Sequence, residues 1–374
     1  MAQLIFWSAF YYLMPAISVR LAAQTDWSVL HISITHTMAV IVWSLCAPLA
    51  GMAVDRGWGG TVMRMGGAVG TVVLVALSLV ADRWVFSGSM LVLGACMATT
   101  LYDPCFALMI RRLDRQGGKA MALVTLVAGF ATLLTFPLVL GLSQGMGWQG
   151  IMLVFAGLSA VAVCLLPGES TVAAPPGRPA PSGSFSVTKP LVLIAVAFGL
   201  VMLGHAIMLF LLPVALARGD GTGATGMLAV AILGPAQIVG RLLWQAFGEL
   251  CAPTVGAVVL FAVFCASPLS LLVFGPMTGA IYGALMVQGA CYGIHTILRP
   301  VLARSFLPGD HIGLGIGAIA TVGLLLMAIG PAVGGAIWTL AGFTGLMGSV
   351  LCLNAVAFVL IVLLFRLERK QGTR

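Results

Sequence analysis

Residues 191–214 read LVLIAVAFGLVMLGHAIMLFLLPV, a stretch without Asp, Glu, Lys or Arg. About 20 consecutive apolar residues let an α-helix cross the hydrocarbon core of a bilayer. A helix that is apolar on every side has no face to present to water. The stretch therefore predicts a membrane-spanning helix.

Similar apolar runs fill most of the 374-residue chain, which is 61% hydrophobic and only 7% charged. A soluble domain is roughly 25% charged, so this composition excludes a soluble enzyme, a nucleic-acid-binding domain and a disordered protein. We predict an all-α membrane protein with twelve transmembrane helices, at about 3–21, 34–54, 64–81, 86–110, 120–142, 148–166, 191–214, 223–246, 253–274, 277–302, 313–338 and 343–365.

The basic residues predict an orientation. With both termini in the cytoplasm, thirteen of the 18 Lys and Arg residues lie in cytoplasmic segments, and only Arg20, Arg83 and Arg218 lie outside. Cytoplasmic loops of membrane proteins are enriched in Lys and Arg. We therefore expect a multi-pass protein of the cytoplasmic (inner) membrane. The 8 cysteines are scattered without a C-x-x-C pair, so we expect no disulfide, no metal site and no cofactor.

A polar segment divides the chain into two halves. Residues 167–190 are rich in Pro, Ser and Gly, which is typical of a flexible or extended linker. Six predicted spans precede it and six follow it. We predict a six-helix bundle over residues 1–166, a cytoplasmic linker over 167–190, and a second six-helix bundle with a short tail over 191–374.

The two halves share a pattern at an offset of about 195 residues. Gly94-Ala95-Cys96 matches Gly289-Ala290-Cys291, and Asp103-Pro104 matches Arg299-Pro300 after one residue of slippage. Matches of Gly and Pro at nearly one offset, in corresponding spans, indicate an internal repeat. Two parallel repeats of this kind are one transporter architecture, with the substrate site near mid-membrane.

The loop after the second span carries a charged motif. It reads GMAVDRGWGG from Gly51 and includes Asp55 and Arg56, with Arg64 beyond; Glu249 stands at the matching place in the second half. The loop resembles the G-x-x-x-D-R-x-G signature of the major facilitator superfamily. The resemblance implies two pseudo-symmetric six-helix bundles and a cytoplasmic latch formed by these five residues. The bland alternative is a charged turn that only fixes topology. For Gly51 we expect a close helix contact.

Span 8 carries Arg241, with Gln237 one turn earlier on the same face. It resembles the monocarboxylate-transporter branch of the superfamily, in which span 8 carries an Asp-x-x-x-Arg pair and the arginine binds the substrate carboxylate. Arg241 is then the anion anchor, because its planar fork matches a carboxylate. Gln237, which stands at the Asp position, would add a hydrogen bond. A structural arginine that snorkels to the interface is the alternative.

Asp103 and Arg299 occupy matching places in spans 4 and 10, which face the cavity in this superfamily. Charges within spans are costly and usually functional. Three roles compete: a gating ion pair, a proton site at Asp103, and a second anion contact at Arg299. A static salt bridge is the structural alternative.

Four uncharged side chains complete the candidate site. His205 in span 7 titrates near physiological pH in its ordinary state, and His295 lies four residues before Arg299. Tyr11 and Tyr292 are aromatic candidates for a cavity wall. We place His205, Tyr292 and Tyr11 with the substrate, and His295 with proton coupling or gating; structural packing is the alternative for each.

We therefore expect a secondary transporter, not an enzyme, that moves a small organic anion by alternating access. Symport with protons is one coupling, and a monocarboxylate is the simplest substrate. The expected partners are the solute, protons and the lipid bilayer, with no nucleic acid and a monomeric protein. The alternatives are a drug or toxic-compound efflux antiporter and a non-transporting receptor or scaffold.

Overall fold

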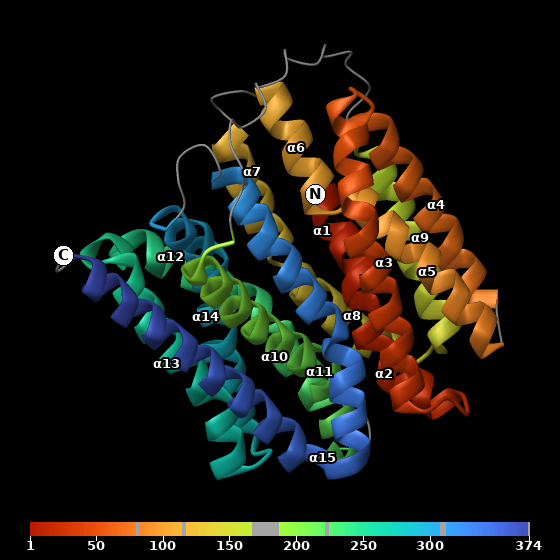
Figure 1. Cartoon of the computed structure of the whole chain (residues 1–374). Helices are drawn as coiled ribbons and strands as arrows, with labels where there is room; N and C mark the ends of the chain where they lie inside the picture. Colours follow the sequence, from red (N-terminus) through yellow and green to blue (C-terminus); the bar gives the residue numbers. More distant parts are fainter. Residues whose placement is uncertain (80–81, 114–116, 167–186, 221–223, 307–311, 373–374) are drawn as a thin grey trace. The chain divides into compact units, whose positions relative to one another are not determined.

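A computed structural model describes residues 1–79, 82–113, 117–166, 187–220, 224–306 and 312–372. Every regular element in these ranges is helical (Figure 1). Ten stretches are long and apolar enough to cross a membrane: Ala2–Gln24, Val29–Val54, Gly59–Leu79, Arg83–Met109, Leu123–Leu142, Lys189–Ala217, Ala224–Phe247, Pro253–Phe274, Thr278–Arg304 and Gly317–Lys370. The all-helical membrane fold is thus confirmed.

Two further observations account for the difference between these ten stretches and the twelve predicted membrane crossings. Trp148–Cys164 is a shorter apolar helix, and it supplies the sixth crossing. The last stretch is two helices that meet at Gly342, where φ is 59° and ψ is −151°. This left-handed conformation favours glycine, so one residue turns the chain between the predicted spans 313–338 and 343–365.

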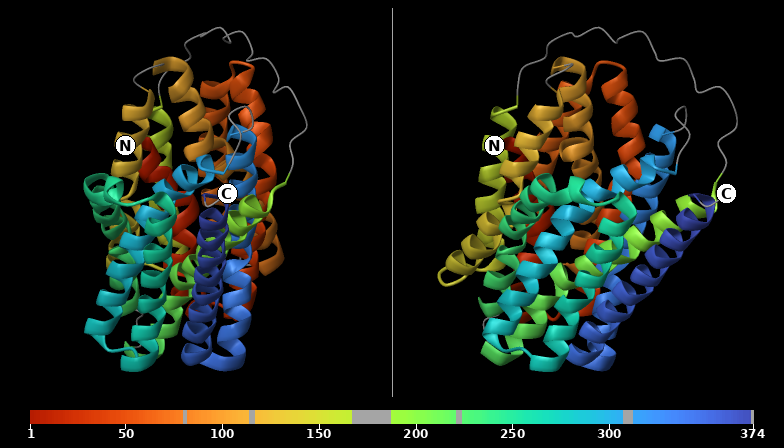
Figure 2. Two further views of the ribbon diagram at one scale, coloured as in Figure 1. Left: turned by 60° about the vertical axis from the view of Figure 1, so that its left-hand side comes forward. Right: turned by 90° about the vertical axis from the view of Figure 1, so that its left-hand side faces the viewer.

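The chain forms two compact units, Met1–Arg178 with Ala217–Ala231, and Pro179–Leu216 with Ile232–Arg374. Unit 1 contains α1 (Ala2–Phe6), the π-helix η1 (Trp7–Tyr12), α2 (Leu13–Gln24), α3 (Val29–Asp55), α4 (Gly59–Leu79), α5 (Arg83–Thr100), α6 (Tyr102–Leu113), α7 (Gly117–Ala128), α8 (Ala131–Leu142), α9 (Trp148–Cys164) and α11 (Ala224–Ala231). Unit 2 contains α10 (Lys189–Asp220) up to Leu216, α12 (Leu233–Phe247), the 3₁₀ helix η3 (Gly248–Leu250), α13 (Pro253–Phe274), α14 (Thr278–Arg304) and α15 (Ile312–Gly372). Figure 2 shows the same helices from two further directions.

The units differ from the predicted halves in one segment. Ala217–Ala231 belongs to unit 1, where α11 packs on α8. The Thr132 hydroxyl donates a hydrogen bond to the Ala231 carbonyl at 3.0 Å. The division into 1–166 and 191–374 stays a prediction, since contact grouping follows packing and not the course of the repeat.

Side-chain caps fix two helix starts. The Ser28 hydroxyl accepts the His31 N–H ahead of α3. The Asp82 carboxylate accepts the N–H groups of Trp84 and Val85, at 2.8 and 2.9 Å, ahead of α5. These groups have no partner within the helix, so the caps fix the starts of α3 at Val29 and of α5 at Arg83, ahead of the predicted spans 34–54 and 86–110.

The repeat is visible in the packing of each unit. In unit 1 a Cβ on Gly94 of α5 would collide with the Ala39 carbonyl of α3. In unit 2 a Cβ on Gly289 of α14 would lie 2.7 Å from the Ala236 Cβ and 2.8 Å from the Leu233 carbonyl oxygen of α12. The two glycines, matched in sequence, therefore make the same close helix crossing in the two units.

Gly289→Val is expected to destabilise the protein by roughly 1–3 kcal/mol or more, because the added atoms have no space between α14 and α12. The measurement is the Tm of purified protein in detergent. Gly283→Val is the matched control, since a Cβ there meets no atom within 4 Å in the same helix. Equal Tm values for the two variants would contradict the close crossing.

One pair of matched spans differs between the units. The fourth span breaks at Leu101, where ψ is −157°, so that α5 ends and α6 begins. The corresponding α14 runs without a break through Pro300. The break leaves the Thr100 carbonyl outside the regular backbone hydrogen bonding of the helix. The Gln3 amide nitrogen donates a hydrogen bond to this carbonyl at 2.7 Å.

Candidate functional site

A polar stripe runs along one face of α14 in unit 2. Gln288, Tyr292, His295 and Arg299 follow one another at spacings of four, three and four residues, which places them on one side of a helix. Gln288 is 0% exposed and His295 is 1% exposed. The membrane-spanning helix thus carries four polar side chains in line, of which Gln288 and His295 are buried and Tyr292 and Arg299 are half-buried.

Aromatic stacking joins this stripe to α10. The rings of His205 and Tyr292 stack with centroids 3.7 Å apart and an interplanar angle of 11°. Tyr292 and His295 are nearly parallel at 5.2 Å. The three predicted residues therefore lie together, with His205 itself 6% exposed.

His295 is oriented by the backbone of α10. Its Nε2 lies 3.2 Å from the Phe198 carbonyl oxygen, which accepts, so we assign the ring proton to Nε2. The other ring nitrogen, Nδ1, is buried without a hydrogen-bond partner, as is Nδ1 of His205. A neutral His295 thus keeps one acceptor available inside the unit.

The two predicted arginines converge on the same tyrosine. Arg299 and Arg241 both interact electrostatically with Tyr292. Arg299 is half-buried, and its Nη1 donates to the Met202 sulfur at 3.8 Å. Arg241, also half-buried, comes from α12. Unit 2 therefore brings together basic groups from two neighbouring helices.

Close helix packing explains why α12 presents its polar face here. Gly293 of α14 packs against the Gln237 backbone of α12, so tightly that a Cβ would collide with its carbonyl. Gln237 is 8% exposed and lies one turn before Arg241. The glycine sets the register in which these α12 side chains approach Tyr292.

The charge of this region is positive by sequence. No Asp or Glu occurs in α10 up to Leu216, in α12, in α13 or in α14, whereas Arg241 and Arg299 lie inside α12 and α14. Arginine in a low-dielectric setting attracts carboxylates and phosphates strongly. The chemistry that this group of residues favours is binding of an anion.

Gln288 is a residue that sequence reasoning missed. Neither its amide nitrogen nor its amide oxygen has a hydrogen-bond partner among the described residues, although the side chain is fully buried. An unsatisfied buried amide is costly and calls for an explanation. Its place one turn before Tyr292 is the sequence signal that would have found it.

Unit 1 holds a second cluster, which is aromatic. The Trp7 ring lies 4.7 Å from Tyr102, 5.4 Å from Tyr11 and 5.7 Å from Trp43, centroid to centroid. Tyr11, predicted as a cavity residue, is 5% exposed and lies 5.5 Å from the His36 ring. Trp7, Trp43 and His36 were missed, because neutral aromatic residues in an apolar run give no distinct signal.

A π-helix organises this aromatic cluster. Trp7 and Tyr11 belong to η1, whose widened turn differs from that of an α-helix. Short π-helical segments occur often at functional sites. The indole N–H of Trp43, a residue only 3% exposed, has no hydrogen-bond partner. The indole N–H of Trp7 is also without a partner among the described residues, so the cluster offers ring faces and two donors in unit 1.

Asp103 lies in the first turn of α6, directly after the break at Leu101. Its side chain is exposed. The positive end of a helix dipole stabilises a carboxylate at this place. Asp103 belongs to unit 1 and Arg299 to unit 2, so the gating pair between them stays a prediction.

The latch residues are placed only in part. Arg56 is exposed at the end of α3, where Gly57 turns the chain with a φ of 91°, and Arg64 is half-buried in α4. A Cβ on Gly51 would meet nothing within 4 Å, so the close helix contact expected there is not found. The side chains of Asp55 and Glu249 lie outside the described residues. The latch stays a prediction.

Comparisons with known proteins identify the fold. Residues 1–249 match the family model described as Major Facilitator Superfamily. Among solved structures, a mutant of the nucleoside transporter NupG gives a TM-score of 0.76 at 14% identity, covering 98% of this chain and 96% of that chain. A bacterial homolog of the human lysosomal transporter Spinster, inward-facing and occupied, gives 0.70 at 13% identity with the same coverage. No curated protein sequence matches.

Proposed function

Because the chain belongs to the Major Facilitator Superfamily, and is therefore a transporter of small molecules across a bilayer, we propose that its solute is a small organic anion. A monocarboxylate is the simplest candidate. Arg241 binds the carboxylate, Gln237 adds a hydrogen bond, and Arg299 supplies a second basic contact. His205 and Tyr292 form a flat wall beside them.

One observation carries this proposal. Arg241 and Arg299 lie in α12 and α14, which pack against each other, and neither helix contains an acidic residue. A central arginine costs roughly 2.5–3.5 kcal/mol on the membrane-insertion scale. Two such residues on facing helices are expected to be kept for a function, and a bound anion offsets their charge.

A cavity in unit 1 also favours an anion. It has a volume of about 500 Å³, and its polar lining comprises Arg20, Gln24, Ser143 and Gln144. The Arg20 Nε is buried without a hydrogen-bond partner. A basic side chain beside uncharged donors is suited to a carboxylate or phosphate. We propose that this cavity attracts the solute from outside.

The proposed coupling uses protons. Asp103 takes up and releases the proton, and Arg299 and His295 respond to its charge. A stable pair with Arg299 favours ionised Asp103, so the pair has to separate for protonation. In this proposal both termini face the cytoplasm, in the inner membrane, and the protein works as a monomer by alternating access.

The test is uptake into proteoliposomes at two pH values. The panel comprises small monocarboxylates, phosphate esters, amino acids, nucleosides and amphipathic cations, each against protein-free liposomes. We expect saturable uptake of carboxylates that is faster with an inward proton gradient. Transport of cations or nucleosides without competition from carboxylates would contradict the proposal that the solute is an anion.

A second candidate is the export of aromatic or cationic compounds. The cluster of Trp7, Tyr11, Trp43 and Tyr102 in unit 1 favours it, because aromatic faces bind planar rings and cations. The nucleoside transporter among the structural neighbours also carries a ring-bearing solute. In the same panel, this candidate expects the cations or nucleosides to be transported.

A further inference from the structure

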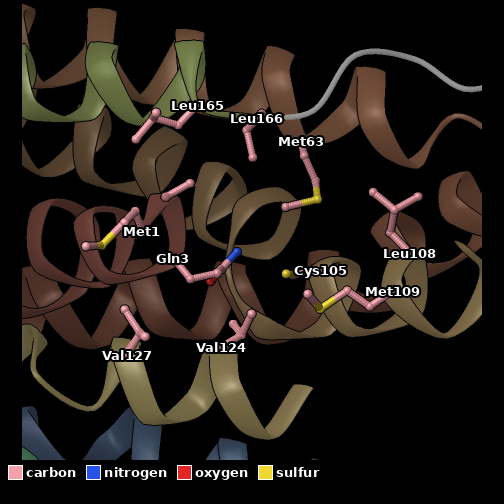
Figure 3. A pocket seen from close by; sticks show the side chains of 11 residues that line it. Met1, Gln3, Met63, Cys105, Leu108, Met109, Val124, Val127, Leu165 and Leu166 are labelled. Carbon is pink, nitrogen blue, oxygen red and sulfur yellow. The ribbon is translucent and has the colours of Figure 1, made fainter. Parts of the chain in front are cut away.

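Unit 1 contains a cavity of about 300 Å³ whose walls come mainly from α1, α4, α6 and α7. Three methionines line it, Met1, Met63 and Met109, together with aliphatic side chains such as Leu108 and Val124 (Figure 3). Its volume is at the lower end of the range for small-ligand sites, about 300–1,000 Å³. Methionine adapts to ligands of irregular shape.

No side chain that lines this cavity is charged; the amino group of Met1 is the charge among its lining residues, and it acts on the Cys105 thiol. The cavity therefore lacks the arginine side chains that mark the group of residues in unit 2. A wall of aliphatic and thioether side chains favours contact with apolar molecules. The chemistry of the wall selects an uncharged, largely apolar ligand.

The cavity nevertheless has one defined polar side chain. Gln3 is 5% exposed, and its amide nitrogen donates to the Thr100 carbonyl at 2.7 Å. The Gln3 side chain also interacts with the Cys105 thiol, and its amide oxygen Oε1 is buried with no hydrogen-bond partner among the described residues. Figure 3 shows the Gln3 amide directed towards the centre of the pocket, near the Cys105 sulfur. The bond to Thr100 fixes the amide, so the free acceptor has a fixed position.

A ligand that fits both features has an apolar body and a single hydrogen-bond donor. We propose that this cavity is a binding site for an aliphatic alcohol, whose hydroxyl donates to the Gln3 Oε1 and whose chain packs among the methionines. The hydroxyl gives this buried acceptor the hydrogen bond that it otherwise lacks. The same chemistry is available from a free alcohol and from a monoacylglycerol of the bilayer.

The site has a structural consequence within unit 1. Cys105, Leu108 and Met109 all belong to α6, the segment that begins after the break at Leu101 and carries Asp103. An occupant packs α6 against α1, where Gln3 resides. The bound alcohol therefore stabilises the position of α6 without contact with the arginines of unit 2.

The test is photolabelling of the purified full chain with 3-azioctanol, an octanol that carries a diazirine, followed by peptide mass spectrometry. We expect adducts concentrated on residues 105–109 and 124–127. Excess 1-octanol or excess monooleoylglycerol lowers this labelling at least fivefold, and whichever competes identifies the source. Octane, which has no donor, competes at least fivefold more weakly.

Two variants sharpen the result. Gln3→Leu removes the acceptor and is expected to reduce the labelling at least fivefold, and Val124→Trp fills the space and abolishes it. Gln144→Leu, in the other cavity of unit 1, is the matched control and leaves labelling unchanged. Labelling spread evenly over α13 and α15, or labelling that survives Val124→Trp in protein with an unchanged Tm, would overturn the site.

Discussion

Replacing Arg241 with Lys is expected to raise the KM for carboxylate uptake by about 10- to 100-fold. Hydrogen bonds to charged groups contribute roughly 1.5–3 kcal/mol each, and lysine replaces a planar two-point fork by a point charge. Positive charge is kept, so a role limited to membrane orientation predicts no change. The measurement is initial uptake into proteoliposomes across a range of carboxylate concentrations.

Arg304→Lys is the control for this experiment. Arg304 is exposed at the end of α14 in the same unit, and its replacement is expected to leave KM within about twofold. Both variants are compared for Tm, so that a folding defect is recognised. If Arg241→Lys keeps both its Tm and its KM, Arg241 does not bind the solute.

Asp103→Asn is expected to abolish proton-driven accumulation, lowering the steady-state gradient of solute at least tenfold, while exchange of labelled for unlabelled solute continues. The amide has nearly the same shape as the carboxylate but takes up no proton at these pH values. Asp103 is the only acidic residue of the predicted fourth span, 86–110. Its replacement therefore leaves that span without a titrating carboxylate.

Asp82→Asn is the matched control at the other end of the same predicted span. Asp82 caps α5 through the Trp84 and Val85 N–H groups, and asparagine is an equally good cap. Accumulation should therefore persist in this variant. Accumulation that also persists in Asp103→Asn would show that Asp103 is not the proton site.

The membrane spans were predictable because the bilayer imposes a simple rule. The span predicted at 253–274 is α13, Pro253–Phe274, and the one predicted at 148–166 is α9, Trp148–Cys164. A long apolar run has few stable alternatives to a transmembrane helix. Polar breaks and caps then set the ends to within a few residues.

Local departures from regular helix were not predictable. The π-helix over Trp7–Tyr12 and the break at Leu101 lie inside stretches that are still apolar enough to cross a membrane, with mean hydropathies of 1.4 and 1.5. Each depends on tertiary contacts: aromatic packing around Trp7, and the bond from Gln3 to the Thr100 carbonyl. The periodicity of apolar residues indicates which face of a helix is buried. It does not indicate which backbone N–H and C=O groups leave the regular hydrogen-bond pattern of the helix.

The part of the candidate site that lies on one helix face was predictable from the spacing of its residues. Spacing along α14 placed His295 and Arg299 on one face, and the structure adds His205 from α10 by stacking on Tyr292. Gln288 escaped because a neutral amide carries no charge to mark it. The role of each residue in binding stays a prediction that the variants above test.

Because of the break at Leu101, the two copies of the repeat differ in how easily their fourth helix bends. An α-helix resists bending because each turn is tied to the next by hydrogen bonds. In the fourth span this ladder is already interrupted and its loose carbonyl is held by Gln3, so α6 can tilt without further loss of backbone bonds. In α14, which continues as a helix through Pro300, only the hydrogen bond that the proline cannot donate is missing, so the same tilt has to deform helical turns that are otherwise still joined. Of the two matched spans, the one formed by α5 and α6 therefore bends more easily than α14. Amide hydrogen exchange is expected to be faster around residues 101–105 than around 297–301.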